Sequence, residues 1–180
     1  PVAATLPAGP VLKTHTDLST TRSLDQIAVD QEGDGLFWRV TGATHGSARI
    51  AADGQTLLFT PEVGFAGQAT ITVQADDGYA LATPITLEVN VSGARLMSID
   101  ITRLAAVANG TARYMEITGD FEDDAGVRLT GSYLQYTSSN TDALIINADG
   151  LVRGMGDGTA IVSVRARGIE GVNVLTVSVD

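Results

Sequence analysis

The stretch QATITVQA, residues 68–75, decides the fold class. In it Ala69, Ile71, Val73 and Ala75 alternate with polar side chains. Successive side chains of a β-strand point to opposite faces, so this alternation is typical of a strand with one face buried. The stretch therefore predicts a half-buried strand.

The same alternation recurs in three more segments. They are PITLEVNV (84–91), GTAIVSVRARG (158–168) and VNVLTVSV (172–179). In none of the segments between them does helical spacing of apolar residues persist for ten residues with capping signals. Hydrophobic residues make up 44% of the chain, which is enough for a packed core. We therefore expect an all-β protein.

Turn signals divide the chain into many short strands and two domains. Asp-Gly pairs, which suit tight hairpins, occur at 53–54 and 149–150. At 91–95, VSGAR separates one strong strand from the next, so we expect domains over residues 1–92, including an N-terminal lead-in, and 93–180. Each holds about seven strands, which predicts two tandem immunoglobulin-like β-sandwiches. The expected strands are 11–16, 24–29, 36–42, 47–51, 55–60, 68–75 and 84–91, then 96–103, 111–118, 132–138, 143–147, 151–154, 158–167 and 172–179.

Charge and composition exclude several classes of function. The net charge of −10 would repel a phosphate backbone, so nucleic acid is a poor partner, whereas divalent cations would be attracted. There are no cysteines, which excludes disulfides and thiolate chemistry. No apolar run approaches the roughly 18 residues of a membrane helix, so we expect no membrane insertion. The start, PVAATLPAGP, leads us to expect a segment of a longer protein.

The loop VDQEGDG, residues 29–35, is a candidate calcium site. Asp30, Glu32 and Asp34 alternate with residues that permit a sharp turn, and calcium takes six to eight oxygen ligands. By the expected strand order this loop lies at the same end of the sandwich as Asp76 and Asp77. Repulsion among these five acids favours a bound cation or full solvation. Both alternatives, a metal site and a solvated polar turn, stay open.

The first half resembles the bacterial cadherin-like repeats of large secreted adhesins, over about residues 24–91. The resemblance rests on a series of motifs in a characteristic order, namely the acidic turn 30–34, His45-Gly46, Asp53-Gly54, Phe59-Thr60-Pro61, Phe65-Ala66-Gly67 and Asp77-Gly78. In cadherins an acidic pair and an A-x-D-x-G turn contribute calcium ligands, and QADDG (74–78) is similar to that turn. The Asn-Asp-rich linker of cadherins is replaced here by VNVSG (89–93), so a complete cadherin site is not expected.

The second half, about residues 96–179, resembles the bacterial immunoglobulin-like domain, group 2. The motifs are YTSSN (136–140), NADGLV (147–152) and the later Gly158-Thr159-Ala160. Tyr136 stands where the family usually has a tryptophan. A second acidic loop, GDFEDDAG (119–126), also fits this family, as either an ordinary turn or a bridging cation site. Both families are non-catalytic modules, which occur in tandem in surface adhesins, in stalks and as accessory domains of secreted enzymes.

Residues that could carry chemistry are few. His15 and His45 are the only histidines, and no nucleophile motif or oxyanion signal accompanies them. Paired acids such as Asp76-Asp77 or Asp123-Asp124 lack an aromatic sugar platform, so we expect no enzyme. Trp38 is interpreted as the core aromatic of its sandwich, with an exposed carbohydrate platform as the alternative.

We therefore expect a non-catalytic structural or adhesion segment, a spacer or stalk, of a larger bacterial cell-surface or secreted protein. Calcium is the one cofactor that the sequence suggests. The expected partners are neighbouring domains of the same polypeptide, and a host or surface protein or a glycan. A short linker would restrict the angle between the two domains. The alternative is a carbohydrate- or protein-binding accessory module of a secreted enzyme or a phage virion protein.

Overall fold

The computed structural model describes residues 2–3, 12–29, 35–102, 104 and 106–178. The chain divides into two compact units, Pro1–Gly93 and Ala94–Asp180. The sequence analysis expected this division between residues 92 and 93. In the described part of the chain, the secondary structure is β-strand apart from one short 3-10 helix, η1. None of these residues forms a helix of the length and hydropathy needed to cross a membrane.

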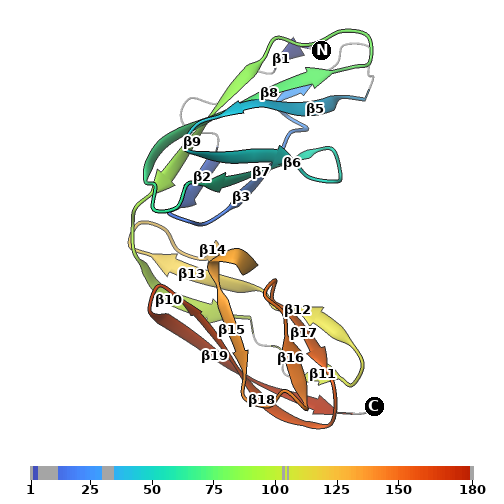
Figure 1. Ribbon diagram of the computed structural model, residues 1–180, viewed down its shortest axis with the longest axis vertical. Coiled ribbons are helices and arrows are strands. Elements are labelled where there is room, and N and C mark those ends of the chain that lie inside the picture. Colours follow the sequence, from blue (N-terminus) through green and yellow to red (C-terminus); the bar gives the residue numbers. More distant parts are fainter. Residues whose placement is uncertain (1, 4–11, 30–34, 103, 105, 179–180) are drawn as a thin grey trace. The chain divides into compact units, whose positions relative to one another are not determined.

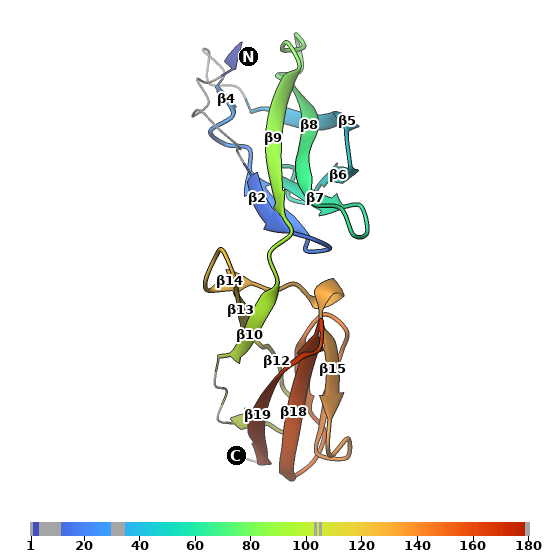
Figure 2. The same ribbon diagram turned by 90° about the vertical axis from the view of Figure 1, so that its left-hand side faces the viewer.

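Unit 1 contains two main sheets (Figures 1 and 2). A four-stranded sheet has the order β2-β9-β8-β5, and a three-stranded sheet has the order β3-β7-β6. A small ladder joins β1 to β4. The strands are β1 (Val2–Ala3), β2 (Leu12–His15), β3 (Thr20–Ser23), β4 (Ala28–Val29), β5 (Phe37–Ala43), β6 (Gly46–Ile50), β7 (Thr56–Pro61), β8 (Gly67–Asp76) and β9 (Ile85–Ser92).

The β8–β9 hairpin forms the centre of the larger sheet. Its alternating apolar residues are buried, with Ala69, Ile71, Val73 and Ala75 on β8 and Ile85, Leu87, Val89 and Val91 on β9. They pack in one cluster with Leu57 and Phe59 of the opposing sheet. The alternation read from residues 68–75 and 84–91 therefore gives the buried face correctly.

Unit 2 has the same kind of four-stranded sheet, in the order β11-β19-β18-β15. Two further ladders, β10-β13-β14 and β12-β17-β16, complete it. The elements are β10 (Leu96–Ile101), β11 (Ala106–Ala108), β12 (Ala112–Tyr114), β13 (Ile117–Phe121), β14 (Val127–Arg128), η1 (Gly131–Tyr133), β15 (Gln135–Ser138), β16 (Leu144–Ile146), β17 (Leu151–Gly154), β18 (Gly158–Ala166) and β19 (Ile169–Ser178).

The two larger sheets share one topology. In each, an early strand pairs in parallel with the last strand of its unit, β2 with β9 and β11 with β19. The last strand is antiparallel to the strand before it, which is antiparallel to a fourth. This repetition is that of two immunoglobulin-like β-sandwiches, so the predicted all-β fold class is confirmed.

The strand predicted at 24–29 is wrong for most of its length. Residues 20–23 form β3, whereas Leu24 to Ile27 make a turn, closed by a hydrogen bond from the Ile27 amide to the Leu24 carbonyl of 2.9 Å. Leu24 and Ile27 are fully buried, so two apolar residues three apart mark a buried turn. The sequence of β3, Thr-Thr-Arg-Ser, lacks the apolar alternation that would have revealed it.

Two predictions in unit 2 also need correction. The single strand expected at 111–118 is two strands, β12 and β13, which pair with different partners, β17 and β10. Residues 131–133 of the strand expected at 132–138 form η1 instead, and the strand begins at Gln135. Gly131 permits this turn because a Cβ there would lie 2.7 Å from the carbonyl oxygen of Ala148.

The first Asp-Gly hairpin shows why such pairs mark turns. Asp53 accepts hydrogen bonds from the amides of Gln55 and Thr56, at 3.0 and 2.9 Å, and from the Thr56 hydroxyl at 2.6 Å. These bonds, that from the Thr56 hydroxyl foremost, lower the pKa of the Asp53 carboxyl. Gly54 follows with φ of 73°, a conformation that glycine adopts without strain.

Replacing Phe59 by alanine tests the core of unit 1. Phe59 is fully buried, so Phe59→Ala should lower the free energy of unfolding by about 3–5 kcal/mol. Trp38, the one tryptophan, lies in unit 1, and its fluorescence during urea unfolding reports that unit alone. Phe37→Ala, at a side chain that is 70% exposed, is the matched control and should change stability by less than about 0.5 kcal/mol. Equal losses in the two variants would contradict the assigned core.

Candidate functional sites

The expected calcium site can be followed only in part. Asp30, Glu32 and Asp34 lie outside the described residues. The described residues continue from Gly35, and Phe37 at the start of β5 pairs with Asp76 at the end of β8. The described segment that follows the acidic loop therefore reaches the same end of the sheet as Asp76.

The two described acids of this site bind the backbone of their own turn. The Asp76 carboxylate accepts a hydrogen bond from the Gly78 amide at 2.8 Å. The Asp77 carboxylate accepts from the amides of Tyr79 and Ala80, at 2.8 and 2.7 Å. These amide bonds, that from Ala80 first, lower the pKa of the Asp77 carboxyl. Asp77 therefore closes the turn after β8 through bonds to its own backbone.

The described carboxylates at this turn are fewer than the oxygen ligands that a calcium site needs. Across the described ranges, no three His, Cys, Asp or Glu side chains gather closely enough to hold a metal ion. Two carboxylates with oxygens already bonded to amides fall short of the six to eight ligands of calcium. Metal binding at this turn therefore depends on Asp30, Glu32 and Asp34.

The second acidic loop, 119–126, holds the start of unit 2 together. The Asp120 carboxylate accepts from the Gly126 amide at 2.8 Å and from the Ser98 hydroxyl at 3.1 Å. The Glu122 carboxylate accepts from the Arg95 amide at 3.3 Å and lies 3.7 Å from the Arg95 guanidinium. These contacts favour the ordinary structural turn over the bridging cation site.

Trp38 and His45 are used within unit 1. Trp38 is half-buried and packs against the hydrophobic core, in agreement with its interpretation as a core aromatic. His45, in the turn between β5 and β6, stacks on Phe65 with ring centroids 4.3 Å apart. Its Nδ1 lies 3.6 Å from a Glu62 carboxylate oxygen. His15 is buried on β2, so the two histidines belong to different elements.

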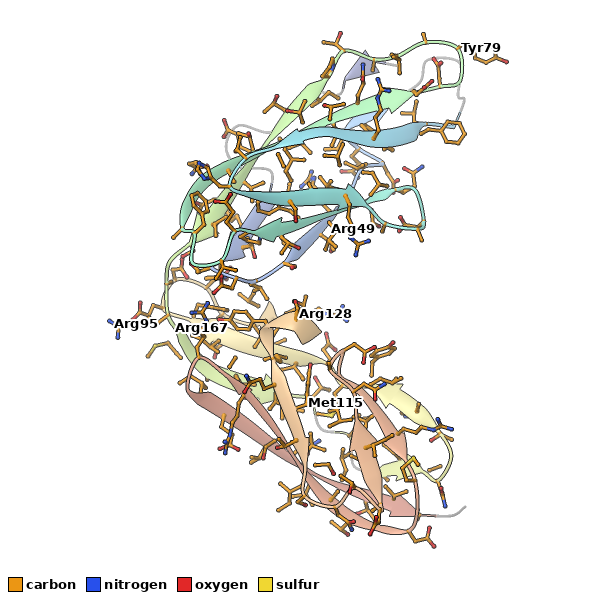
Figure 3. All side chains as sticks on the ribbon, in the orientation of Figure 1. Arg49, Tyr79, Arg95, Met115, Arg128 and Arg167 are labelled. Atoms are coloured by element: carbon orange, nitrogen blue, oxygen red, sulfur yellow. The ribbon has the colours of Figure 1, made fainter. Side chains whose placement is uncertain are left out.

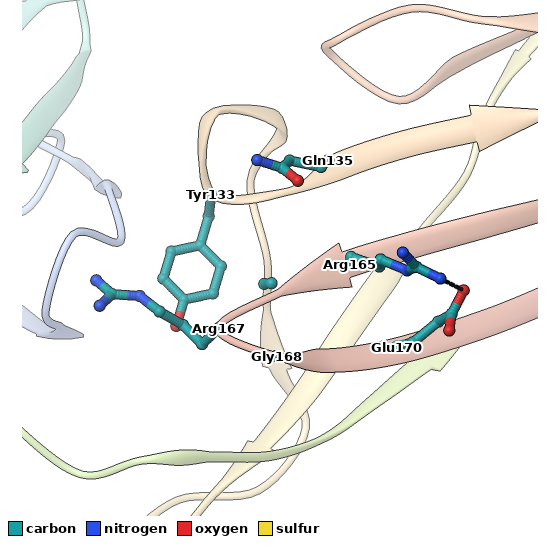
Figure 4. Close-up of a pocket in the computed structure, with 7 residues that line it drawn as sticks. Tyr133, Gln135, Arg165, Arg167, Gly168 and Glu170 are labelled. Atoms are coloured by element: carbon teal, nitrogen blue, oxygen red, sulfur yellow. Dashed lines mark ion pairs between the residues drawn. The ribbon is translucent and has the colours of Figure 1, made fainter.

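Unit 2 contains a site that the sequence analysis did not find. It is a shallow depression of about 620 Å³ lined by Tyr133, Gln135, residues 165–168 and Glu170, and we call it the charged hollow (Figure 4). An Arg165 guanidinium nitrogen lies 3.0 Å from a Glu170 carboxylate oxygen. The Arg167 guanidinium carbon lies 5.9 Å from the centre of the Tyr133 ring.

Three elements come together to build the hollow. Tyr133 ends η1, Gln135 begins β15, and the others surround the β18–β19 turn. The turn is a two-residue loop, Arg167-Gly168, closed by the pairing of Ala166 with Ile169. Tyr133 is more than thirty residues away in sequence, which is why no local pattern revealed the site. The run RARG at 165–168 is the one signal that could have suggested it.

Residues 1–90 match the family described as Bacterial Ig domain, and this chain belongs to that family. The match covers half of the chain. The sequence analysis expected this half to resemble bacterial cadherin-like adhesin repeats, and the match shows a bacterial Ig or cadherin-like domain there. The group 2 resemblance of residues 96–179 stays a prediction. Among proteins with curated functions, none matches.

Solved structures similar to this chain come from several kinds of protein. The S-layer protein rSbsC(31-844) is 19% identical with a TM-score of 0.41, over 79% of this chain and 20% of that one. The endo-fucoidan hydrolase MfFcnA4, from glycoside hydrolase family 107, is 13% identical with a TM-score of 0.36, over 95% and 28%. The human desmocollin-1 ectodomain is 11% identical with a TM-score of 0.33, over 94% and 39%. The chain thus spans about a fifth of the length of the S-layer protein.

The charge of Asp77 should stabilise unit 1 in a pH-dependent way. Because its folded pKa is lowered, the contribution is present above the unfolded value of about 3.9 and disappears as the pH falls through the folded value. Asp77→Asn keeps an acceptor oxygen but loses the charge, so it should lower the melting temperature of unit 1 at pH 7.

The difference in melting temperature from the parent chain should then shrink toward zero as the solution is acidified. Melting followed by Trp38 fluorescence at a series of pH values measures it. Asp25→Asn, at another exposed acid of unit 1, controls for net charge. A difference for Asp77→Asn that stays constant with pH would contradict the assigned role.

Proposed function

We propose that residues 1–180 form a structural and adhesive segment, a spacer or stalk, of a larger bacterial cell-surface or secreted protein. Membership of the bacterial Ig domain family supports a modular part over a complete enzyme. The proposal includes no catalytic step. Its expected partners are neighbouring domains of the same polypeptide and a surface-exposed protein or glycan.

The observation that carries the proposal is the way each unit fixes its end of the short connection. In unit 1, β9 ends at Ser92, whose carbonyl accepts from the Thr16 amide at 2.9 Å and from the Thr16 hydroxyl at 3.2 Å. In unit 2, the Arg95 carbonyl accepts from the Glu122 amide at 3.0 Å. Gly93 and Ala94 alone separate these two anchored residues. A connection this short supports a spacer in which the two sandwiches do not move independently.

A second candidate function is an accessory module that binds a carbohydrate or protein ligand, in a secreted enzyme or a phage virion protein. The charged hollow supports this candidate because it is concave and lined by several hydrogen-bonding groups. Trp38 does not support it, since this side chain packs against the core. The two functions are compatible, because a spacer can also carry a binding site.

Calcium stiffening of unit 1 is the remaining part of the proposal. It depends on Asp30, Glu32 and Asp34 acting together with Asp76 and Asp77. The sequence supports it through the alternation of three acids and through the strongly negative net charge. The turn bonds of Asp77 provide the alternative, a polar turn that needs no metal.

Lengthening the connection tests the spacer. Insertion of Gly-Ser-Gly-Ser between Gly93 and Ala94 should turn a single rotational correlation time, shared by both units, into two shorter ones. NMR relaxation of backbone amides measures this directly. The same four residues inserted after Gly78, in the exposed turn of unit 1, are the control and should leave the shared value unchanged. Independent tumbling of the two units in the parent chain would contradict the spacer function.

Calorimetry with calcium tests the metal site. A stoichiometric site should give a heat of binding, and calcium at a hundredfold excess over Kd should add about 2.7 kcal/mol to the stability of unit 1 compared with EDTA. Both effects should vanish in the double variant Asp30→Asn and Asp34→Asn. They should persist in Asp142→Asn, an exposed acid of unit 2. No heat and no change in melting would make the loop a polar turn.

A further inference from the structure

The charged hollow presents a row of planar polar groups on the outer face of unit 2. Gln135 pairs with Arg165 across β15 and β18, and Arg165 pairs with Glu170 across β18 and β19. Directly opposed residues of antiparallel strands share one face of a sheet, with Cβ atoms about 5 Å apart. An amide, a guanidinium and a carboxylate therefore come from neighbouring strands on one face of the sheet, and Figure 4 shows the guanidinium of Arg165 beside the carboxylate of Glu170.

This row offers both donors and acceptors of hydrogen bonds. The guanidinium has five N–H groups, the amide has donors and an acceptor, and the carboxylate accepts only. The ion pair with Glu170 involves one terminal nitrogen of Arg165, Nη2. Such a mixture matches the hydroxyl groups of a sugar, which both donate and accept. An acidic peptide presents a carboxylate on each side chain, and Glu170 would repel this series of charges more strongly than the single anionic group of one sugar residue.

Tyr133 and Arg167 form one end of the hollow. Tyr133 is held between the Phe121 ring, 6.5 Å away between centroids, and the Arg167 guanidinium. The lining carries two arginines against one glutamate, so its formal charge is +1 in a chain whose net charge is −10. Two guanidinium groups in one lining suit a ligand with an anionic substituent.

Arg167 occupies a backbone conformation that does not suit an arginine. Its φ is 51° and that of Gly168 is 82°, as in the two-residue turns that favour Asn-Gly. A residue that carries a Cβ is strained in this region, and such strain is found preferentially at functional sites. The turn thus keeps a guanidinium beside Tyr133 where asparagine would fold better.

We propose that the charged hollow binds a sugar residue that carries a carboxylate or sulfate group, as part of an acidic glycan. Arg165 and Arg167 bind the anionic group, since a guanidinium matches two oxygens of a carboxylate or sulfate at once. Gln135, Glu170 and the Tyr133 hydroxyl bind ring hydroxyls. The volume lies within the range of about 300–1,000 Å³ typical of ligand sites. This site does not depend on the spacer function, and either can fail alone.

NMR titration of the intact chain tests the site. The probes are trigalacturonate for a carboxylate sugar, a heparin-derived tetrasaccharide for a sulfated one, neutral maltotriose, and a hexaglutamate peptide. We expect amide shifts in 133–135 and 165–170 with at least one of the two acidic sugars. The acidic sugar that binds with the lower Kd identifies the anionic group that the hollow prefers. Maltotriose should bind at least about tenfold more weakly, since it lacks the charge-assisted bonds.

Arg167→Asn is the decisive variant because it separates binding from stability. Asparagine suits the turn, so unit 2 should keep or raise its melting temperature, while affinity for the acidic sugar falls about tenfold or more. Arg165→Lys keeps the charge but loses the planar fork, and should also weaken binding. Arg113→Ala and Arg153→Ala, exposed on β12 and β17 outside the hollow, are matched controls and should bind normally.

Three results would overturn the proposal. The first is that neither acidic sugar shifts these amides at a concentration of about 10 mM. A specific site is expected to have a lower Kd than this and would be largely occupied. The second is tighter binding of hexaglutamate, which would make the hollow a protein-binding site. The third is a loss of unit 2 stability in Arg167→Asn with unchanged sugar affinity, because Arg167 would then serve only to hold Tyr133.

Discussion

Each unit depends on one long antiparallel hairpin, β8–β9 in unit 1 and β18–β19 in unit 2. The backbone bonds of these hairpins fix which alternate residues face inward, and every other strand of the larger sheets is added at their edges. Ile71 and Val73 on β8, and Val162 and Val164 on β18, are fully buried as a result. The turns at the hairpin ends are thereby held in place as well, and they carry Asp77 in unit 1 and Arg167 in unit 2. Figure 3 shows Tyr79 and Arg167 at these two turns.

Much of the fold follows from residue patterns within single strands. The alternation at 68–75, 84–91 and 158–166 predicts the correct buried faces, because each of these strands has one face in solvent and one face in the core. The pattern fails where burial comes from a turn, as for Leu24 and Ile27. The alternation expected at 172–179 holds only in part, since Val172 and Val174 fall in one phase whereas Leu175 and Val177 fall in the other. Pairing of Val174 with Ile161, and of Leu175 with Ala160, leaves Val172 and Val174 exposed and Leu175 buried.

The candidate sites were less predictable, for a physical reason. Asp77 was chosen from sequence as a metal ligand, yet its carboxylate closes its own turn, because short acidic side chains bond readily to nearby amides. Asp30, Glu32 and Asp34 stay a prediction. The charged hollow combines Tyr133, Gln135, Arg165 and Glu170, which only the pairing of β15, β18 and β19 brings together. Register across strands is a property of the folded sheet, so no local window of sequence contains it.

Native-state hydrogen exchange of the intact chain tests most directly whether the two hairpins hold their units together. The paired amides of β8 with β9, and of β18 with β19, should be the slowest to exchange in their respective units. They should exchange at the rate of global unfolding of that unit, while amides of the outer strands β5 and β15 exchange faster through local opening. If the β5 or β15 amides outlast those of the hairpins, the hairpins do not hold the sandwiches together and the account is wrong.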